Sequence, residues 1–228
     1  MKVAIDGPAG SGKSTVAKAI AKRCGLTLLD TGAMYRSVAL TCINRGVALD
    51  DEAVVTDVAR SITISFEPAE PVQRVLIDGT DVTEAIRTPE VDRNVSAVAA
   101  IPAVREALVE QQRAIGNAGD VVAEGRDIGT VVFPDAEVKV FLTADPAARA
   151  LRRAVQRDGG DAAVDAKATA DEKEVATIMA DLIRRDEADS SRKAAPLKPA
   201  EDAVHIDSSN KTVNEVVDLI VSLMEEAR

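Results

Sequence analysis

A glycine-rich segment near the start of the sequence has the residue types and spacing of a phosphate-binding loop. The run that matches G-x-x-x-x-G-K-[ST] at every fixed position is Gly7-Pro8-Ala9-Gly10-Ser11-Gly12-Lys13-Ser14, followed by Thr15. Its glycines let backbone N–H groups turn inward as an anion nest, and the following helix adds the positive end of its dipole. Lys13 can reach the β- and γ-phosphates of a nucleotide, and the Ser14 hydroxyl can bind Mg²⁺. The sequence therefore predicts nucleotide binding at residues 7–15.

Two further polar segments follow predicted strands and carry arginine. Arg36 ends the segment 30–36, and Arg126 lies beside Asp127 in the segment 124–127. Ligands of an open parallel sheet gather at the carboxyl ends of its strands. A guanidinium fork suits an acceptor phosphate, and Asp127 can hold a Mg²⁺-bound water or contact the acceptor. The alternative for Arg126 and Asp127 is an ion pair of a surface loop.

Helical spacing places two more groups of charged residues on single helix faces. The first group is Arg149, Arg152, Arg153 and Arg157, and the second is Arg185, Asp189 and Arg192. The first group precedes a small, acidic segment from residue 158, an arrangement that resembles the edge of a lid over ATP phosphates. A solvated helix face is the other interpretation of these residues.

Three residues with reactive side chains are predicted to be structural. His205 is the only histidine, and it lies inside a short predicted strand. Phosphoryl transfer does not need a strong base, so a catalytic role for it is not expected. Cys24 and Cys42 lack metal-ligand spacing and are expected to be small buried or half-buried thiols.

The elements that must position these residues alternate between strand and helix. The predicted strands are 2–6, 26–29, 120–124, 137–142 and 203–206. The predicted helices are 13–24, 32–45, 51–60, 89–100, 102–117, 146–157, 171–189 and 213–227. This order predicts an α/β fold with a five-stranded parallel sheet flanked by helices. Alternating residues at 62–66 and 74–77 predict a small antiparallel sheet inserted into the main domain.

Composition narrows the class of ligand. The net charge of −10 would repel a nucleic-acid duplex or an anionic lipid surface, and 2% aromatic residues give little to stack on single-stranded bases. We therefore expect no nucleic-acid partner and no membrane partner. Strand 2–6 begins directly after Met1, and no apolar run is long enough to span a bilayer, so a cytoplasmic protein is expected. Nothing in the sequence marks an interface, and a monomer is expected.

Seven stretches distributed over nearly the whole chain resemble the bacterial short-chain cytidylate kinases. They are IDGPAGSGKST, LLDTGAMYR, IRTPEV, VSAVAAIPAVREAL, EGRDIGTVVFPDA, RALRR and RRDEADSSRKAAPL. Many kinases share the first stretch, whereas IRTPEV, VSAVAAIPAVREAL and GRDIGTVVFPDA are much more particular to this family. The likeness extends from Val3 to about Val217.

The resemblance implies a P-loop nucleoside-monophosphate kinase fold with three parts. These are a core of 1–39, 101–157 and 196–228, a nucleoside-monophosphate-binding insert of 40–100 that contains the small sheet, and a helical lid of 158–195. It also implies ATP and Mg²⁺, with transfer of the γ-phosphoryl group of ATP to CMP or dCMP.

The resemblance further implies site residues by matching position. The residues implied at the CMP site are Thr31, Tyr35, Arg36, Ser96, Arg105, Arg126, Asp127, Arg185, Asp189 and Arg192. Ser96, Arg185 and Asp189 would contact the sugar, and Arg153 and Arg157 would approach the ATP phosphates. The implied catalytic residues are Lys13, Arg126, Asp127, Arg153 and Arg192. Thr31 stands where relatives have serine, and it keeps the hydroxyl that faces the base.

Two alternatives stay open from the sequence. The first is another small-molecule P-loop kinase for adenylate, uridylate or shikimate, although adenylate kinases usually have Gly-Lys-Gly-Thr where this chain has Gly-Lys-Ser-Thr at 12–15. The second is a regulator that binds nucleotide and transfers nothing. Such a regulator would have no need of Arg36, Arg105 and Arg126 around an acceptor pocket. A GTPase is disfavoured because Asn210-Lys211 lacks the aspartate of a guanine-binding Asn-Lys-x-Asp motif.

Overall fold

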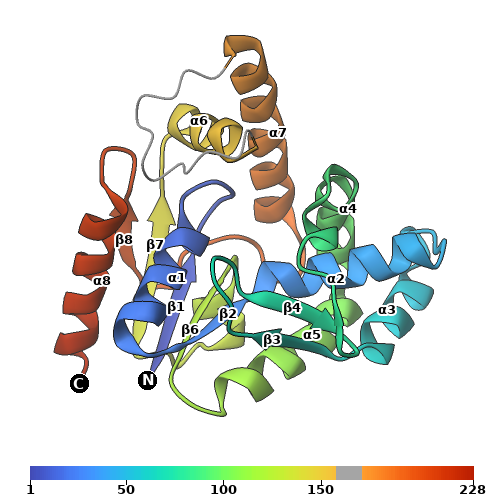
Figure 1. Cartoon of the computed structure of the whole chain (residues 1–228), viewed down its shortest axis with the longest axis horizontal. Coiled ribbons are helices and arrows are strands. Elements are labelled where there is room, and N and C mark those ends of the chain that lie inside the picture. Colours follow the sequence, from blue (N-terminus) through green and yellow to red (C-terminus); the bar gives the residue numbers. More distant parts are fainter. Residues whose placement is uncertain (158–170) are drawn as a thin grey trace. The chain divides into compact units, whose positions relative to one another are not determined.

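The computed structural model describes residues 1–157 and 171–228, apart from the side chains of residues 156 and 157. The chain forms two compact units (Figure 1). The first comprises Met1–Leu28 and Gly119–Arg228, and the second comprises Leu29–Ala118. Residues 158–170 of the predicted lid lie outside the described residues. The functional division into core, insert and lid stays a prediction.

The first unit is built on the predicted five-stranded sheet. Its strands are β1 (Lys2–Asp6), β2 (Thr27–Asp30), β6 (Val121–Gly125), β7 (Val138–Thr143) and β8 (Val204–Asp207). Their order is β2-β6-β1-β7-β8, and β1 runs parallel to both of its neighbours, β6 and β7. Strand β2 begins in this unit and continues into the second. The prediction of a parallel α/β fold is confirmed, and the carboxyl end of β1 leads directly into the glycine-rich loop.

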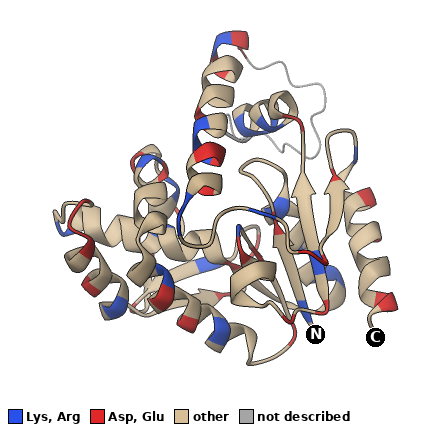
Figure 2. Ribbon diagram, turned by 180° about the vertical axis from the view of Figure 1, so that it is seen from behind, with Lys and Arg blue, Asp and Glu red and all other residues tan. Residues whose placement is uncertain are grey.

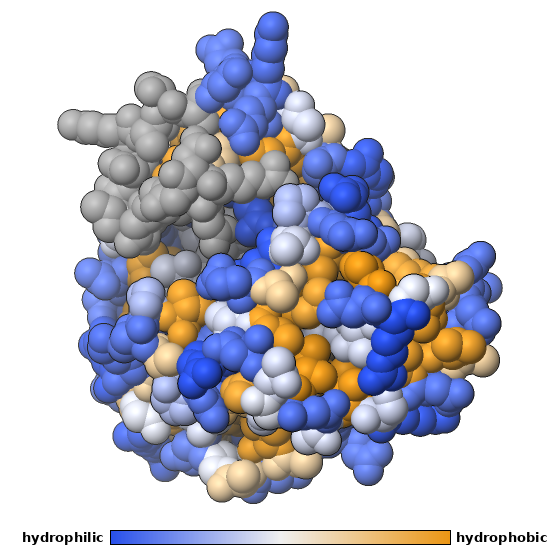
Figure 3. Space-filling view, turned by 45° about the vertical axis from the view of Figure 1, so that its right-hand side comes forward, coloured by the Kyte–Doolittle hydropathy of each residue, from blue (hydrophilic) through white to orange (hydrophobic). Residues whose placement is uncertain are grey.

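Helices pack against this sheet, and two of them form a second, smaller hydrophobic cluster with each other. They are α1 (Lys13–Cys24), α6 (Pro146–Arg157), α7 (Glu172–Ser191) and α8 (Val213–Glu226), with a π-helix, η2 (Ile128–Val132). Valine, isoleucine and leucine of the strands pack with α1 and α8 in the main core. Helices α6 and α7 lie side by side and pack through Ala150, Ala154, Ile178 and Leu182 (Figure 1). The first turn of α7, with Glu172 and Glu174, presents hydrophilic side chains to solvent (Figure 3).

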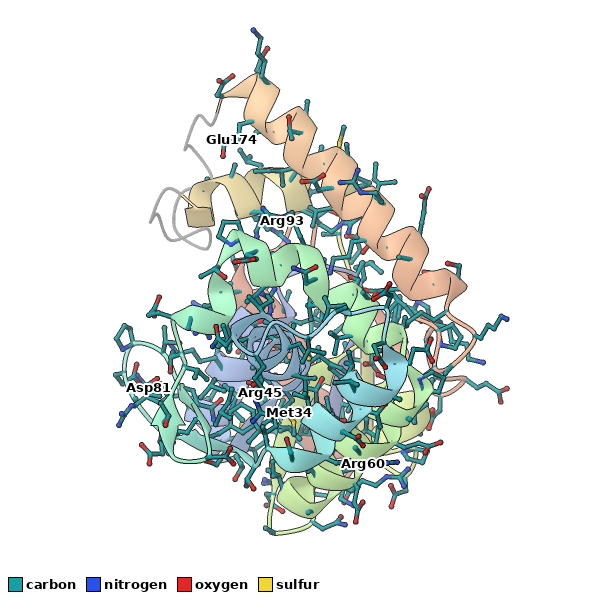
Figure 4. All side chains as sticks on the ribbon, turned by 90° about the vertical axis from the view of Figure 1, so that its right-hand side faces the viewer. Met34, Arg45, Arg60, Asp81, Arg93 and Glu174 are labelled. Atoms are coloured by element: carbon teal, nitrogen blue, oxygen red, sulfur yellow. The ribbon has the colours of Figure 1, made fainter. Side chains whose placement is uncertain are left out.

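The second unit combines four helices with the small sheet. Its elements are α2 (Thr31–Asn44), α3 (Glu52–Ser61), β3 (Ile64–Glu67), β4 (Arg74–Ile77), β5 (Thr80–Asp81), η1 (Ala85–Arg87), α4 (Pro89–Ala100) and α5 (Pro102–Gly116). Helix α2 packs against α3, α4 and α5, and its Met34 is fully buried. Arg45, Arg60 and Asp81 lie at or beside the ends of their elements and are exposed (Figure 4).

The small sheet has one strand more than predicted. Asp78 and Gly79 adopt φ values of 50° and 81°, which form a tight two-residue turn after β4. Positive φ at both central residues is the hairpin geometry that Asp-Gly favours. The turn folds β5 back onto β4 in antiparallel pairing, so the sheet has the order β3-β4-β5.

The three residues with reactive side chains differ in burial: His205 is exposed, Cys24 is half-buried and Cys42 is buried. His205 lies on β8 with its ring centroid 5.6 Å from that of Phe141 on the neighbouring strand. Cys24 and Cys42 are free thiols, and Cys42 is buried. Within the described residues, no helix is long and apolar enough to cross a membrane.

We expect the docking of α8 to be a major source of stability of the first unit. Ile220 is fully buried in the main core, and Ile220→Ala should lower the free energy of unfolding by about 2–5 kcal/mol in chemical denaturation. Its neighbour Leu219 is 46% exposed, so Leu219→Ala should change the free energy by no more than about 0.5 kcal/mol. Similar losses in both variants would contradict the packing of α8 described above.

Candidate functional site

The glycine-rich loop turns sharply between β1 and α1, and its backbone depends on glycine. Gly7 packs so tightly that a Cβ atom there would lie 2.0 Å from the carbonyl oxygen of Leu142. Gly12 precedes α1 with φ of 93°, in the left-handed region that side chains disfavour. The first turn of α1 carries Ser14 and Thr15, both exposed. The predicted phosphate loop therefore has the required strand–loop–helix setting, with the helix N-terminus open to a ligand.

Lys13 is a buried cation at the base of this loop. Its ammonium donates a hydrogen bond of 2.7 Å to the carbonyl oxygen of Pro8. The pKa of Lys13 is lowered to about 7, chiefly by burial and next by the charge of Arg126, against the opposing effects of Glu124 and Asp6. The free protein therefore holds Lys13 close to its titration point at neutral pH, where an arriving phosphate would favour the charged form.

A buried carboxylate connects the loop's strand to the segment that carries Arg126 and Asp127. Asp6 ends β1 and is 4% exposed. Its two oxygens accept the backbone N–H groups of Ile128 and Gly129, each at 2.8 Å. Burial raises the pKa of Asp6 to about 6, although these two hydrogen bonds lower it, while Asp127 raises it and Lys13 lowers it. Asp6 was missed from the sequence, and its place at the end of a buried strand was the available signal.

The structure brings several predicted residues together after β6 and along α7. The Nε of Arg126 donates to Asp189 at 2.8 Å, and Arg192 lies 3.8 Å from the other oxygen of that carboxylate. Asp189 is 4% exposed and Asp127 is also buried. Arg185, one helical turn before Asp189, is close enough to lower the pKa of Lys13. Three arginines, two aspartates and a lysine of the first unit thus form one charged cluster, and Figure 2 shows the mixed charges along α7.

The second unit holds the remaining predicted acceptor residues in two groups. Arg36 on α2 forms an ion pair with Asp92 on α4 and donates to the carbonyl oxygen of Ile86 at 3.1 Å. Arg105 on α5 is 5% exposed and lies over the Tyr35 ring, with its guanidinium carbon 5.2 Å from the ring centroid.

The two hydroxyl residues of this unit occupy helices α2 and α4. Thr31 is buried in the first turn of α2, where Asp30 caps the helix by accepting the N–H of Ala33 at 2.9 Å. Ser96 is half-buried on α4, one turn after Asp92 and on the same helix face. Asp92 was not predicted, and nothing in its local sequence indicated that it would hold Arg36.

The arginines of α6 differ in their burial and in the contacts described for them. Arg149 is 5% exposed and bonded to Ala9 and Asp186, and Arg152 is bonded to Ser208. Arg153 is half-buried. The side chain of Arg157 lies outside the described residues. The predicted basic strip is therefore not a uniform solvated face, because Arg149 and Arg152 bond to protein groups.

Within the described residues, no group of three or more His, Cys, Asp or Glu side chains could hold a metal ion. A Mg²⁺ ion at the glycine-rich loop would accordingly take most of its ligands from nucleotide phosphates and water. The exposed hydroxyl of Ser14 fits that mode of binding, because Mg²⁺ prefers oxygen ligands and retains several waters.

The chain matches one protein family in its sequence, both by a family model and by curated relatives. A sequence model of the family described as "Cytidylate kinase" matches residues 3–226. The curated cytidylate kinase of Limosilactobacillus fermentum is 46% identical over 226 residues, which cover 99% of this chain and 96% of that protein. The cytidylate kinase of Pelotomaculum thermopropionicum is 48% identical over 227 residues, with 99% and 96% coverage. Among solved structures, an uncharacterized protein from Eubacterium ventriosum has a TM-score of 0.50 at 14% identity, covering 99% of this chain and 98% of that one.

The lowered pKa of Lys13 predicts that phosphate binding takes up protons. At pH 8 the free ammonium is mostly deprotonated, and a bound polyphosphate should recharge it, so binding of ADP should take up nearly one proton at this residue. At pH 6 the residue is already charged and the uptake should vanish. Calorimetry in buffers with different ionisation enthalpies measures the number of protons.

The matched comparison is Lys13→Met, which removes the titrating group but leaves the ionisation of ADP itself. The difference in uptake between the two proteins at pH 8 is the contribution of Lys13. Equal uptake by both proteins would contradict a lowered pKa for this lysine.

Proposed function

The chain belongs to the cytidylate kinase family, and from that membership we infer that it transfers the γ-phosphoryl group of ATP to CMP, giving CDP and ADP. The observation that carries this conclusion is identity of about half over the full length of curated relatives. The charged cluster beside the glycine-rich loop supports it, because the cluster contains more cationic groups than ATP binding alone requires. We extend the proposal to dCMP as a second acceptor.

We propose that residues 7–15 hold the ATP phosphates. The backbone N–H groups of the loop and the N-terminus of α1 would bind the β-phosphate, and Lys13 would neutralise charge on the transferred group. Mg²⁺ bound at Ser14 would supply further neutralisation of the phosphate oxygens. Arg153 and Arg157 would add positive charge near the γ-phosphate.

The acceptor residues of each unit have separate proposed roles. In the second unit, Arg36 and Arg105 would bind the CMP phosphate, Tyr35 would support Arg105 through the observed ring contact, and Thr31 and Ser96 would contact the base and the sugar. These roles rest on the family resemblance and on the position of each side chain within its unit.

In the first unit, Arg126 and Arg192 would bind the phosphate at which transfer occurs. Arg185 and Asp189 would contact the sugar, and Asp127 would orient a metal-bound water or the acceptor. The attacking oxygen belongs to an ionised phosphate, so no side chain has to remove a proton from it. The chemistry then depends on positioning and on electrostatic stabilisation.

The same proposal extends to location and assembly. Because ATP and CMP are freely diffusing nucleotides of the cytoplasm, we propose that the enzyme acts there. That it acts as a monomer stays a prediction, which sedimentation of the purified protein would test.

CMP-dependent production of ADP from ATP tests the proposed function. We expect ADP release in a coupled assay with CMP or dCMP, and little release with AMP or shikimate. The variant Lys13→Ala should keep its fold and lose about 10²–10³ of the rate, because it lacks a charge that stabilises the transferred group. A folded Lys13→Ala protein with near-normal turnover would show that the observed activity comes from elsewhere.

Arg36→Ala and Arg126→Ala should weaken use of CMP more than use of ATP. Each removes a charge-assisted hydrogen bond to the acceptor, a loss of about 1.5–3 kcal/mol or roughly ten- to a hundredfold in kcat/KM for CMP. Arg45→Ala is the matched control, because Arg45 follows the same helix as Arg36 but is exposed and bonded only weakly, to Ser61 at 3.3 Å. Loss of ATP affinity with unchanged CMP kinetics would assign Arg36 and Arg126 to the other substrate.

A further inference from the structure

Helix α6 contacts the glycine-rich loop through a backbone carbonyl group of the loop. Nη1 of Arg149 donates to the carbonyl oxygen of Ala9 at 3.0 Å and forms an ion pair with Asp186 of α7. The other oxygen of Asp186 accepts the N–H of Ala9 at 3.2 Å. Both backbone polar groups of one loop residue are therefore held by a single ion pair that joins α6 to α7.

A second connection reaches the loop two residues later. The Ser208 hydroxyl lies 3.0 Å from the carbonyl oxygen of Ser11 and 3.0 Å from that of Thr143. The backbone N–H of Ser208 already donates to the carbonyl oxygen of Thr143. We therefore assign the single hydroxyl hydrogen of Ser208 to the carbonyl oxygen of Ser11. Arg152 in turn donates to the hydroxyl of Ser208 at 3.1 Å and to its carbonyl oxygen at 2.6 Å. Arg149 and Arg152 are three residues apart, so one face of α6 serves both connections.

These contacts determine the direction of two peptide groups. In a planar trans peptide the carbonyl of one residue points opposite to the N–H of the next. A carbonyl of Ala9 held by Arg149 therefore directs the N–H of Gly10 to the opposite side, and a carbonyl of Ser11 held by Ser208 does the same for Gly12. Peptides beside glycine flip easily, and a flipped peptide would present a carbonyl oxygen to a phosphate.

Tight packing leaves α6 little freedom to change this arrangement. A Cβ atom at Gly10 would lie 3.1 Å from the Cβ of Arg149. Ala9 is 8% exposed and packs in the small cluster of α6 and α7 side chains. The loop and the helix pair therefore form one rigid contact.

We propose that Arg149, Arg152, Asp186 and Ser208 are positioning residues of the glycine-rich loop, which hold the N–H groups of Gly10 and Gly12 toward the nucleotide phosphates. The inference rests on the proposed binding of ATP at this loop. Arg149 and Arg152 would then differ in role from Arg153, because they act on the loop backbone and Arg153 is proposed to act on a phosphate.

The experiment compares nucleotide affinity in variants that remove one contact each. Ser208→Ala and Asp186→Asn are the preferred changes because both nearly preserve side-chain size, and Arg152→Ala is the third. Ser222→Ala and Arg184→Ala are matched controls, since Ser222 bonds within α8 and Arg184 forms an exposed ion pair on α7. The probe is ADP, measured by calorimetry, with thermal unfolding as a check that each variant is folded.

The loss of one oriented N–H should raise the Kd for ADP about 3- to 10-fold in each of the three variants. The KM for ATP should rise in parallel, while the KM for CMP stays within about twofold of its original value. In the free protein, the amide resonances of Gly10 and Gly12 should shift in Ser208→Ala and Asp186→Asn, and remain in place in the two controls.

Unchanged ADP affinity in folded Ser208→Ala and Asp186→Asn would overturn the inference. Equal increases in the KM values for ATP and CMP would also overturn it, because a merely structural role would weaken the use of both substrates. A wild-type protein that binds ADP but forms no ADP from ATP when CMP is added would refute the proposed function alone. The comparison of ADP affinities would still decide the inference. A wild-type protein that does not bind ADP would overturn both.

Discussion

The carboxylate of Asp6 is the group on which the rest of the first unit depends. It lies at the end of the central strand, where the backbone leaves the sheet to form the glycine-rich loop, and it is almost completely buried. A buried carboxylate is costly unless hydrogen bonds satisfy it, and here the two N–H groups at the start of η2 do so. The same two hydrogen bonds fix the position of the backbone that directly follows Arg126 and Asp127. The loop for one substrate and the residues proposed for the other therefore share a single anchor.

A protein with net charge −10 that must bind polyanions needs positive charge in chosen places, and this chain pairs its site arginines with carboxylates. Arg126 is paired with Asp189, and Arg36 is paired with Asp92. Such pairing holds a guanidinium in one orientation and reduces the cost of burying it. It leaves other N–H groups of the fork for a phosphate, because each guanidinium has five. The carboxylates thus determine where positive charge is presented, although their own negative charge repels the nucleotide phosphates.

Sequence reasoning was most successful where a local pattern determines the backbone. The glycine-rich loop, the five strands and the helices could be predicted, because spacing of apolar residues and glycine specifies them within a few residues. The pairing of Asp6 with Ile128 could not, since it joins residues 122 apart and depends on which strands become neighbours. Helical spacing correctly places Arg149 and Arg152 on one face of α6, but it does not reveal that this face meets the loop backbone. Strand β5 is a different case: Asp78-Gly79 was a visible hairpin signal, and its implication for Thr80 and Asp81 was missed.

The contacts that hold the glycine-rich loop come from distant parts of the chain. Arg149, Asp186 and Ser208 stand 140, 177 and 197 residues away from the loop residues that they bind. During synthesis the loop leaves the ribosome first, and the last of these partners, Ser208, is added only after β8 has been made. Nucleotide can therefore stabilise only a nearly complete chain, because a ligand contributes to folding only when its binding site exists. An unfinished or truncated chain gains no such protection from ATP, and proteolysis would remove it while complete molecules are retained.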